Sequence, residues 1–262
     1  MKRILVTGVT GQIGIELVPY LRKIYGDNNV VATARRQAPD VISESGPFEL
    51  LDVRDGNAFS QLMKTYKIDT IIHLAGILSA RAEASPKDSW DINANGSLAA
   101  LECAKEHEAA LFFPSSIAAF GPSAPADNTP QVTIQRPTTI YGVAKVACEL
   151  LCDYYHLKYG VDTRGLRIPG LISYEALPGG GTTDYAVHIY YEAISCGKYT
   201  SYIAPKTFMD MMYMPDALEA IVKLMEADPS RLVHRNAYNV SAMSFEPEQI
   251  AASIRKVMPS VV

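Results

Sequence analysis

Short hydrophobic runs rich in β-branched residues alternate with longer segments of helical period along the first two thirds of the chain. Short apolar runs bounded by turn signals predict buried strands, and apolar residues three or four positions apart predict amphipathic helices. On this basis we predict strands at 3–7, 30–34, 70–74, 110–113 and 163–168, and helices at 13–25, 55–66, 86–106 and 141–159. Such alternation is typical of βαβ units, so the predicted fold class is α/β, a doubly wound parallel sheet of the Rossmann type.

The pattern changes after Ile168. A glycine run at 179–181 interrupts it, and short helical and irregular stretches follow to the end of the chain. We therefore expect a large first domain, residues 1–168, and a smaller C-terminal lobe, residues 169–262. The boundary is soft, because no linker separates the two parts and segments of either can interleave with the other.

Charge and hydropathy restrict the class of partner. The chain has a formal net charge of -4 and no run of Lys or Arg, which argues against binding to nucleic acid or to an anionic membrane. No apolar segment approaches the roughly 20 residues of a membrane-spanning helix, and Met1-Lys2-Arg3 precedes an apolar run too short for a signal peptide. The cysteines lack zinc-site spacing, so no metal is expected. We expect a cytoplasmic protein acting on a small molecule.

A glycine-rich turn follows the first predicted strand. Gly8, Gly11 and Gly14 form a GxxGxxG spacing that leads directly into the first predicted helix. In that position glycines permit a tight turn, and the helix N-terminus offers unpaired N–H groups to a diphosphate. The alternative is an ordinary turn between strand and helix. The strand-turn-helix setting favours a dinucleotide cofactor bound by the first domain and a substrate bound by the second lobe.

The end of the second predicted strand bears on the choice of cofactor. NAD-binding domains usually carry an acidic residue there for the ribose 2′-hydroxyl, whereas this chain reads Ala34-Arg35-Arg36. Two guanidinium groups beside the missing carboxylate would pair with a 2′-phosphate, so NADP is plausible beside NAD. Alternatively, both arginines only cover an exposed turn.

Two further turns are expected at the same edge of the sheet. Asp52-Val53 is placed to reach the adenine end of a dinucleotide, although Asp52 could equally cap the next helix. Leu74-Ala75-Gly76 follows the strand at 70–74, and its small residues allow the backbone to approach a cofactor closely.

Tyr141 and Lys145 are the strongest candidates for catalysis. They stand four positions apart on a predicted helix and so share one face, where the ammonium stabilises the phenolate that can take a proton from an alcohol. Ser116 follows a predicted strand at the carboxyl edge of the sheet, where its hydroxyl can orient a substrate oxygen. Taken one at a time, a structural Tyr/Lys pair and a Ser-rich turn are the simpler interpretations. The occurrence of Tyr141, Lys145 and Ser116 together, after a phosphate-binding turn, favours an oxidoreductase.

The glycine turn, Pro114-Ser115-Ser116 and the Tyr141-xxx-Lys145 pair resemble those of the extended short-chain dehydrogenase/reductase family. Longer strings resemble the branch of that family that oxidises L-threonine. They are HLAGILS at 73–79, RPTTIYG at 136–142, PGLIS at 169–173, GGGTTDY at 179–185 and DMMYMPD at 210–216. The resemblance covers essentially the whole chain, although the C-terminal segment is shorter than in the family.

The resemblance implies oxidation of the L-threonine side-chain hydroxyl to 2-amino-3-oxobutyrate, with hydride passing to the nicotinamide and the proton to Tyr141. It also implies a homodimer packed through the helices at 86–106 and 141–159, with NAD as the expected cofactor. The catalytic set would be Tyr141, Lys145 and Ser116. The cofactor would contact Gly8, Gly11, Gln12, Ile13, Gly14, Ala34, Arg35, Arg36, Asp52, Val53, Leu74, Ala75, Gly76, Asn95, Pro114, Tyr141, Lys145, Pro169 and Leu171. The substrate would contact Ser79, Ser116, Tyr141, Gly180, Thr182 and Asp184.

Within the lobe, consecutive glycine amides near Gly180 can form a nest for the amino-acid carboxylate, and Asp184 can meet its ammonium. The alternative is that Thr182, Thr183 or Asp184 caps the helix expected near Tyr185. Two other functions stay open. A UDP-sugar 4-epimerase would use the same catalytic residues with Arg231 and Arg235 toward a nucleotide diphosphate, and a regulator would bind the cofactor without turnover.

Overall fold

The computed structural model describes residues 1–262 and is built on a seven-stranded parallel sheet. Its strands are β1 (Ile4–Thr7), β2 (Val30–Ala34), β3 (Phe48–Leu50), β4 (Thr70–His73), β5 (Ala110–Ser116), β6 (Thr163–Ile168) and β9 (Tyr238–Asn239). They lie in the order β3-β2-β1-β4-β5-β6-β9, and every neighbouring pair is parallel. The predicted doubly wound α/β fold is confirmed.

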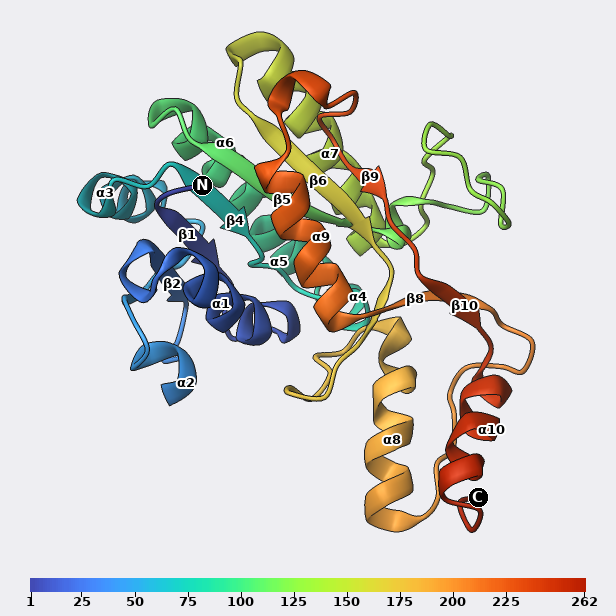
Figure 1. Ribbon diagram of the computed structural model, residues 1–262. Helices are drawn as coiled ribbons and strands as arrows, with labels where there is room; N and C mark the ends of the chain where they lie inside the picture. The colour runs from blue at the N-terminus through green and yellow to red at the C-terminus, as the bar shows by residue number, and fades with distance from the viewer.

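Helices cover both faces of this sheet, as the ribbon in Figure 1 shows. On one face, α1 (Gln12–Tyr25), α2 (Asp40–Ser43) and α9 (Met214–Glu226) pack on a core of mostly aliphatic side chains. On the other face, α3 (Gly56–Tyr66), α6 (Gly96–Glu106) and α7 (Ile140–Tyr159) pack on a second core. Because both faces are covered, β1, β2, β4 and β6 are buried along their whole length. This burial explains the mostly apolar sequences of β1 and β2, whereas β6 also buries Arg164 and Arg167.

The helix predicted at 86–106 is interrupted. It divides into α5 (Pro86–Trp90), a π-helical turn at Asp91–Asn95 and α6, and the short α4 (Ser79–Ala84) precedes it. A π turn inserts an extra residue and shifts the face that each side chain presents. Strand β5 also extends to Ser116 rather than ending at Phe113, so that Ser116 pairs with Ile168.

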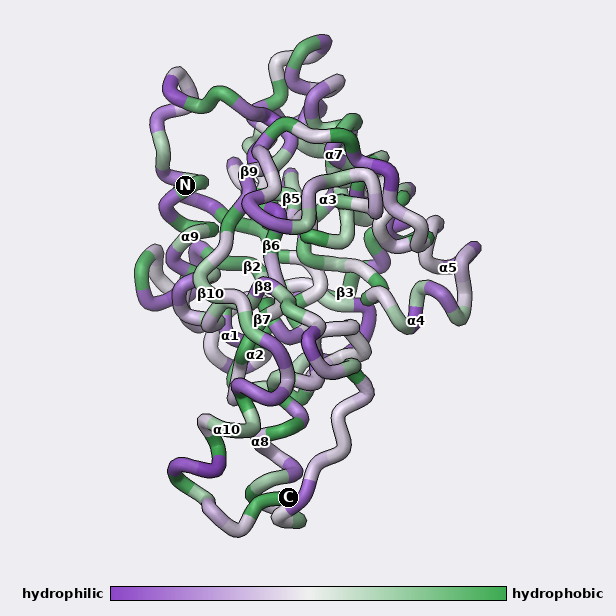
Figure 2. The backbone as a smooth tube through the Cα atoms, turned by 90° about the vertical axis from the view of Figure 1, so that its right-hand side faces the viewer, coloured by the Kyte–Doolittle hydropathy of each residue, from purple (hydrophilic) through white to green (hydrophobic).

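The rest of the chain forms a lobe with a small sheet of its own. Strands β7 (Gly170–Ile172), β8 (Met209–Tyr213) and β10 (Met243–Phe245) form this sheet in the order β10-β8-β7. The lobe's helices α8 (Tyr185–Cys196) and α10 (Pro247–Val257) pack together through a third core and project away from the large sheet (Figures 1 and 2). Short 3-10 turns lie at 27–29, 117–119, 182–184 and 229–231.

The chain crosses the proposed division after Ile168 more than once. Helix α9 packs on the large sheet against α1, and β9 pairs with β6 as its last strand. Both elements follow β8 in sequence but belong to the seven-stranded sheet and the helices that cover it, so the two parts interleave. None of the helices is both long and apolar enough to cross a membrane.

Strand β1 lies between β2 and β4. The chain continues from β1 to β2 and β3 on one side of the sheet and from β4 to β5 and β6 on the other, so the strand order reverses between β1 and β4. In sheets of this type the crevice beyond the carboxyl ends of the strands at such a reversal is the usual ligand site. The residues at that edge are therefore the first to consider.

Candidate active site

The turn after β1 needs glycine at two positions. Gly8 has φ +70°, and a Cβ on it would lie 2.6 Å from the backbone of Ala75 in the turn after β4. A Cβ on Gly14 would lie 2.5 Å from the Cα of Val9. The glycines thus let the two turns and the start of α1 come into direct backbone contact, as the spacing predicts.

The start of α1 fits the diphosphate of a dinucleotide. Its N-cap is Gly11, which has no side chain to bond the first amides of the helix. The buried Nε2 of Gln12 also has no hydrogen-bond partner. Free N–H groups at the positive end of a helix dipole favour an anion, so these residues fit the predicted cofactor.

At the predicted adenine end, Asp52 is bound to Arg54. Its carboxylate accepts from Arg54 Nη2 at 2.6 Å and Nε at 2.9 Å, and these hydrogen bonds lower the pKa of Asp52 to about 2. The cap of α3 is Asp55, which accepts from Ala58 N at 3.0 Å, so Asp52 does not have that role.

Arg35 and Arg36 are exposed beside the buried Ala34, and neither forms an ion pair. Their guanidinium groups are therefore accessible to a ligand at the end of β2.

The turn after β4 is fixed by Thr7 and Asn93. Ala75 N donates to Thr7 Oγ1 at 3.2 Å, and the amide of Asn93 bonds both to Ile77 N, at 2.7 Å, and to Ile77 O, at 3.0 Å. Asn93 was not among the predicted residues. Asn95, which was, donates to Asp91 at 2.9 Å, and the π turn that contains both asparagines is not visible in the sequence.

Lys145 lies beside Tyr141 and against the end of β5. Its Nζ donates to the Pro114 carbonyl at 2.5 Å and lies 5.3 Å from the centroid of the Tyr141 ring. The Phe113 ring, with its centroid 4.8 Å away, covers another side of the ammonium. The structure thus brings Lys145 together with Tyr141 and with the end of β5.

The start of α7 packs tightly against the residues after Ser116. A Cβ on Gly142 would lie 2.3 Å from the Ala118 carbonyl oxygen, so only glycine permits this approach. Ser116 Oγ accepts from Ala118 N at 3.2 Å, which places its hydroxyl in the same short turn. Glu83 of α4, which was not predicted, accepts from Ile140 N at 2.8 Å and supports the first turn of α7.

Two predicted substrate contacts meet across the two parts of the chain. Ser79 Oγ lies 3.2 Å from Thr182 Oγ1 and accepts from Thr182 N at 3.2 Å. Next to them, the Asp184 carboxylate accepts from Gly180 N at 2.8 Å and from Gly181 N at 2.7 Å. The glycine amides expected to bind a substrate carboxylate therefore have a partner within the protein in this structure.

The remaining predicted residues lie along the same edge. Pro169 joins β6 to β7, Leu171 lies within β7 against the core of the first face, and Val53 is buried after β3. The predicted set therefore gathers around the carboxyl ends of β1 to β6.

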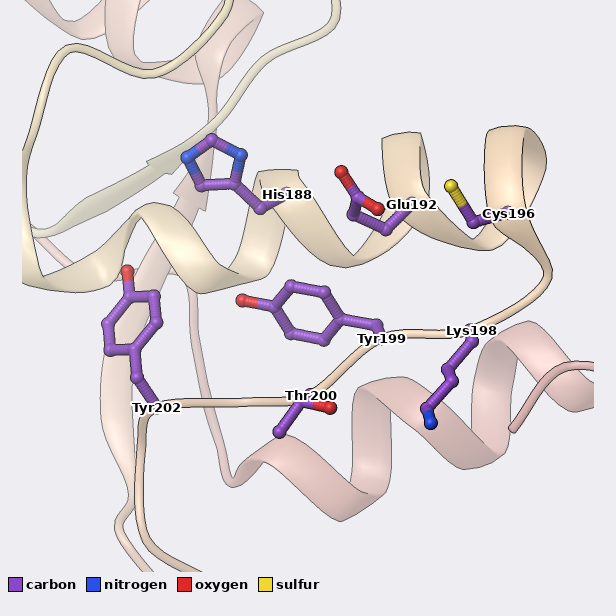
Figure 3. Close-up of a pocket in the computed structure, with 7 residues that line it drawn as sticks. All are labelled: His188, Glu192, Cys196, Lys198, Tyr199, Thr200 and Tyr202. Carbon is purple, nitrogen blue, oxygen red and sulfur yellow. The ribbon is translucent and has the colours of Figure 1, made fainter.

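Two open surface pockets lie away from this edge of the sheet. One, of about 500 Å³, lies between α8 and the segment at 198–202 and is lined by His188, Glu192, Cys196, Lys198, Tyr199, Thr200 and Tyr202 (Figure 3). The other, of about 470 Å³, lies beside the C-terminal half of α7. Neither contains a residue of the predicted dehydrogenase site, although the second includes Arg235, and no group of three metal-binding side chains occurs in the protein.

The model of the NAD dependent epimerase/dehydratase family matches residues 4–241. An uncharacterized epimerase/dehydratase of Staphylococcus haemolyticus is 58% identical over 260 residues, which cover 99% of this chain and 82% of that protein.

Two solved structures are similar along the whole chain. An L-threonine dehydrogenase of Clostridium difficile is 59% identical with a TM-score of 0.97, and the match covers 100% of this chain and 82% of that one. An L-threonine dehydrogenase of Phytophthora infestans is 49% identical with a TM-score of 0.95, covering 100% and 83%. The similarity extends through both sheets and confirms the resemblance stated from the motifs.

Proposed function

The chain belongs to the NAD dependent epimerase/dehydratase family, and we propose that it oxidises the side-chain hydroxyl of L-threonine to 2-amino-3-oxobutyrate. The main support for an alcohol oxidation is the position of Lys145, which donates to the Pro114 carbonyl and lies beside the Tyr141 ring. The choice of substrate draws on the similar L-threonine dehydrogenases and on the contact between Ser79 and Thr182.

In this mechanism Tyr141 is the proton acceptor. The ammonium of Lys145 stabilises the phenolate form electrostatically, and Ser116 orients the substrate hydroxyl through its own hydroxyl. A bound nicotinamide would accept the hydride. The glycine turn and the first amides of α1 would hold its diphosphate, and Ser79 and Thr182 would contact the amino acid.

Cofactor choice is part of the proposal. We propose a nicotinamide dinucleotide, with NADP accepted beside NAD because Arg35 and Arg36 are exposed and unpaired where an acidic residue would otherwise repel a 2′-phosphate. Initial rates with each cofactor test this point. A Michaelis constant for NADP far above that for NAD would contradict it.

We also propose a homodimer through α5, α6 and α7. Apolar side chains on these helices are exposed, among them Leu150 at 61% and Leu157 at 84%, seven positions apart on α7. An exposed apolar face of this kind commonly marks an isologous interface. Sedimentation velocity should give a dimer, and Leu157→Glu should shift it toward monomer.

The epimerase alternative is less well supported. Arg235, one of the cations it needs, is bound to Asp162 at 2.7 Å and lies beside Thr163, at the amino end of β6. That edge is opposite to the one that carries Ser116. The regulator alternative gives no reason for Lys145 to be held beside Tyr141.

The deciding experiment is absorbance at 340 nm with L-threonine and either cofactor. We expect reduction of the cofactor without any sugar nucleotide, and loss of turnover in Tyr141→Phe with cofactor binding nearly unchanged, since only the proton acceptor is removed. No reduction with either cofactor would refute the proposal, and turnover in Tyr141→Phe would refute the role of the tyrosine.

A further inference from the structure

A buried ion pair lies directly beneath the candidate catalytic residues. Glu149 of α7 and Arg167 of β6 are 1% and 3% exposed, and Arg167 Nη2 lies 2.7 Å from Glu149 Oε2. Arg167 Nε also donates to Oε1 at 3.0 Å, so the pair is bidentate. The other partner of Oε1 is the hydroxyl of the buried Ser115, which donates to it.

The pair is the centre of a larger network. Gln135 Nε2 donates to Glu149 Oε2 at 2.9 Å, and Arg167 Nη1 donates to the Gln131 carbonyl and to Asn239 Oδ1, each at 2.9 Å. Gln131 and Gln135 belong to the long connection between β5 and α7, and Asn239 ends β9. The network therefore ties this connection to β6 and β9 at the carboxyl edge of the sheet.

Residues one turn apart on α7 bond to consecutive residues at the end of β5. Tyr141, Lys145 and Glu149 follow one another at intervals of four and so share one face of the helix. Lys145 bonds the carbonyl of Pro114, and Glu149 bonds the side chain of Ser115. The next residue on the strand is Ser116, which has to meet the substrate.

We propose that Glu149 is a positioning residue that fixes the end of β5 against α7 and thereby sets Ser116 relative to Tyr141 and Lys145. This inference rests on the proposed dehydrogenase function. A buried ion pair contributes little net stability compared with apolar residues of similar size, so its benefit is the defined geometry that it imposes. A carboxylate satisfies Ser115, Gln135 and Arg167 simultaneously because it accepts through two oxygens.

The same strand offers a matched control. Arg164, also on β6, is 4% exposed and makes a bidentate pair with Asp162, with distances of 3.0 Å and 2.7 Å. Asp162 and Arg164 lie at the amino end of the strand, away from Ser116. The Asp162 side chain is 30% exposed and pairs with Arg235 as well. Asp162→Asn therefore disrupts ion pairs at the other end of β6 without touching the edge that carries Ser116.

The test compares Glu149→Gln and Asp162→Asn in steady-state kinetics, thermal stability and NADH binding by fluorescence. We expect Glu149→Gln to lower kcat about tenfold or more while the Kd for NADH stays within about twofold. We expect Asp162→Asn to keep kcat within about twofold even where its loss of Tm is as large. Equal kcat in Glu149→Gln and the wild type, or equal loss in both variants, would overturn the proposal.

If Glu149→Gln does not fold, Ser115→Ala decides, because it removes one hydrogen bond and keeps the ion pair. An unchanged kcat in that variant would overturn the proposal, and a lower kcat with unchanged NADH binding would support it.

Hydrogen–deuterium exchange separates this proposal from the proposed function. A wild type inactive with L-threonine refutes the substrate and reaction. Independently of that result, faster exchange at residues 114–121 in whichever of Glu149→Gln and Ser115→Ala folds, and not in Asp162→Asn, supports the positioning role. Unchanged exchange there refutes it.

Discussion

His73 provides a test of the electrostatics at the carboxyl edge of the large sheet. It ends β4, is 1% exposed, and its Nδ1 lies 3.1 Å from Thr7 Oγ1. Its Nε2 is buried and has no partner. Burial, together with the nearby ammonium of Lys145, lowers the pKa of His73 to about 3. The folded protein therefore keeps this imidazole neutral.

The sign of the effect on stability follows from the lowered pKa. Between pH 6.5 and pH 3 the unfolded chain binds a proton that the folded chain does not, so stability falls as the pH is lowered through this range. The loss amounts to about 1.4 kcal/mol per pH unit, or about 3 kcal/mol between pH 6.5 and pH 4.5. Above pH 6.5 the contribution is fully present.

Urea unfolding of the wild type and of His73→Asn, from pH 8 to pH 4.5, measures this contribution. The asparagine amide can still reach Thr7 but does not titrate. At pH 8 the difference in unfolding free energy reports packing and the hydrogen bond with Thr7, and we expect the wild type to lose about 3 kcal/mol relative to His73→Asn by pH 4.5. Other titrating groups are common to both proteins and cancel. Parallel pH profiles would refute the reasoning.

Three further predictions concern two glycines and one buried arginine. Gly8→Ala should lower the free energy of unfolding by about 2 kcal/mol or more and weaken cofactor binding, because Gly8 has a positive φ and an added Cβ would lie 2.6 Å from the Ala75 backbone. An unchanged Tm and an unchanged Kd for the cofactor would contradict this prediction. Arg164→Met should lower the free energy of unfolding, measured with urea, by about 3 kcal/mol, because the guanidinium donates to three carbonyls at the end of α9 and pairs with Asp162. The kcat of this variant should equal that of the wild type. Gly142→Ala should lower kcat about tenfold or more by moving the start of α7, as steady-state rates will show.

Local patterns account for the part of the site that could be read in advance. The glycine turn and the Tyr141 and Lys145 pair depend on spacing within one turn or one helix, and strand ends fix which residues reach the sheet edge. Glu149 could have been found in the same way, since it continues the interval of four after Lys145. Without Arg167 beside it, however, a glutamate at that spacing reads as an exposed helix face.

The sequence by itself determined the fold class, the glycine turn after β1 and the placing of Tyr141 and Lys145 on one helix face, because these follow from periodicity and from the conformations that glycine allows. Contacts between distant segments decided the rest. Asp184 occupies the glycine amides, Asn93 rather than Asn95 fixes the turn after β4, and Arg235 lies at the opposite sheet edge. Each outcome depends on which groups tertiary packing brings within hydrogen-bond distance, and spacing along the chain does not encode that choice.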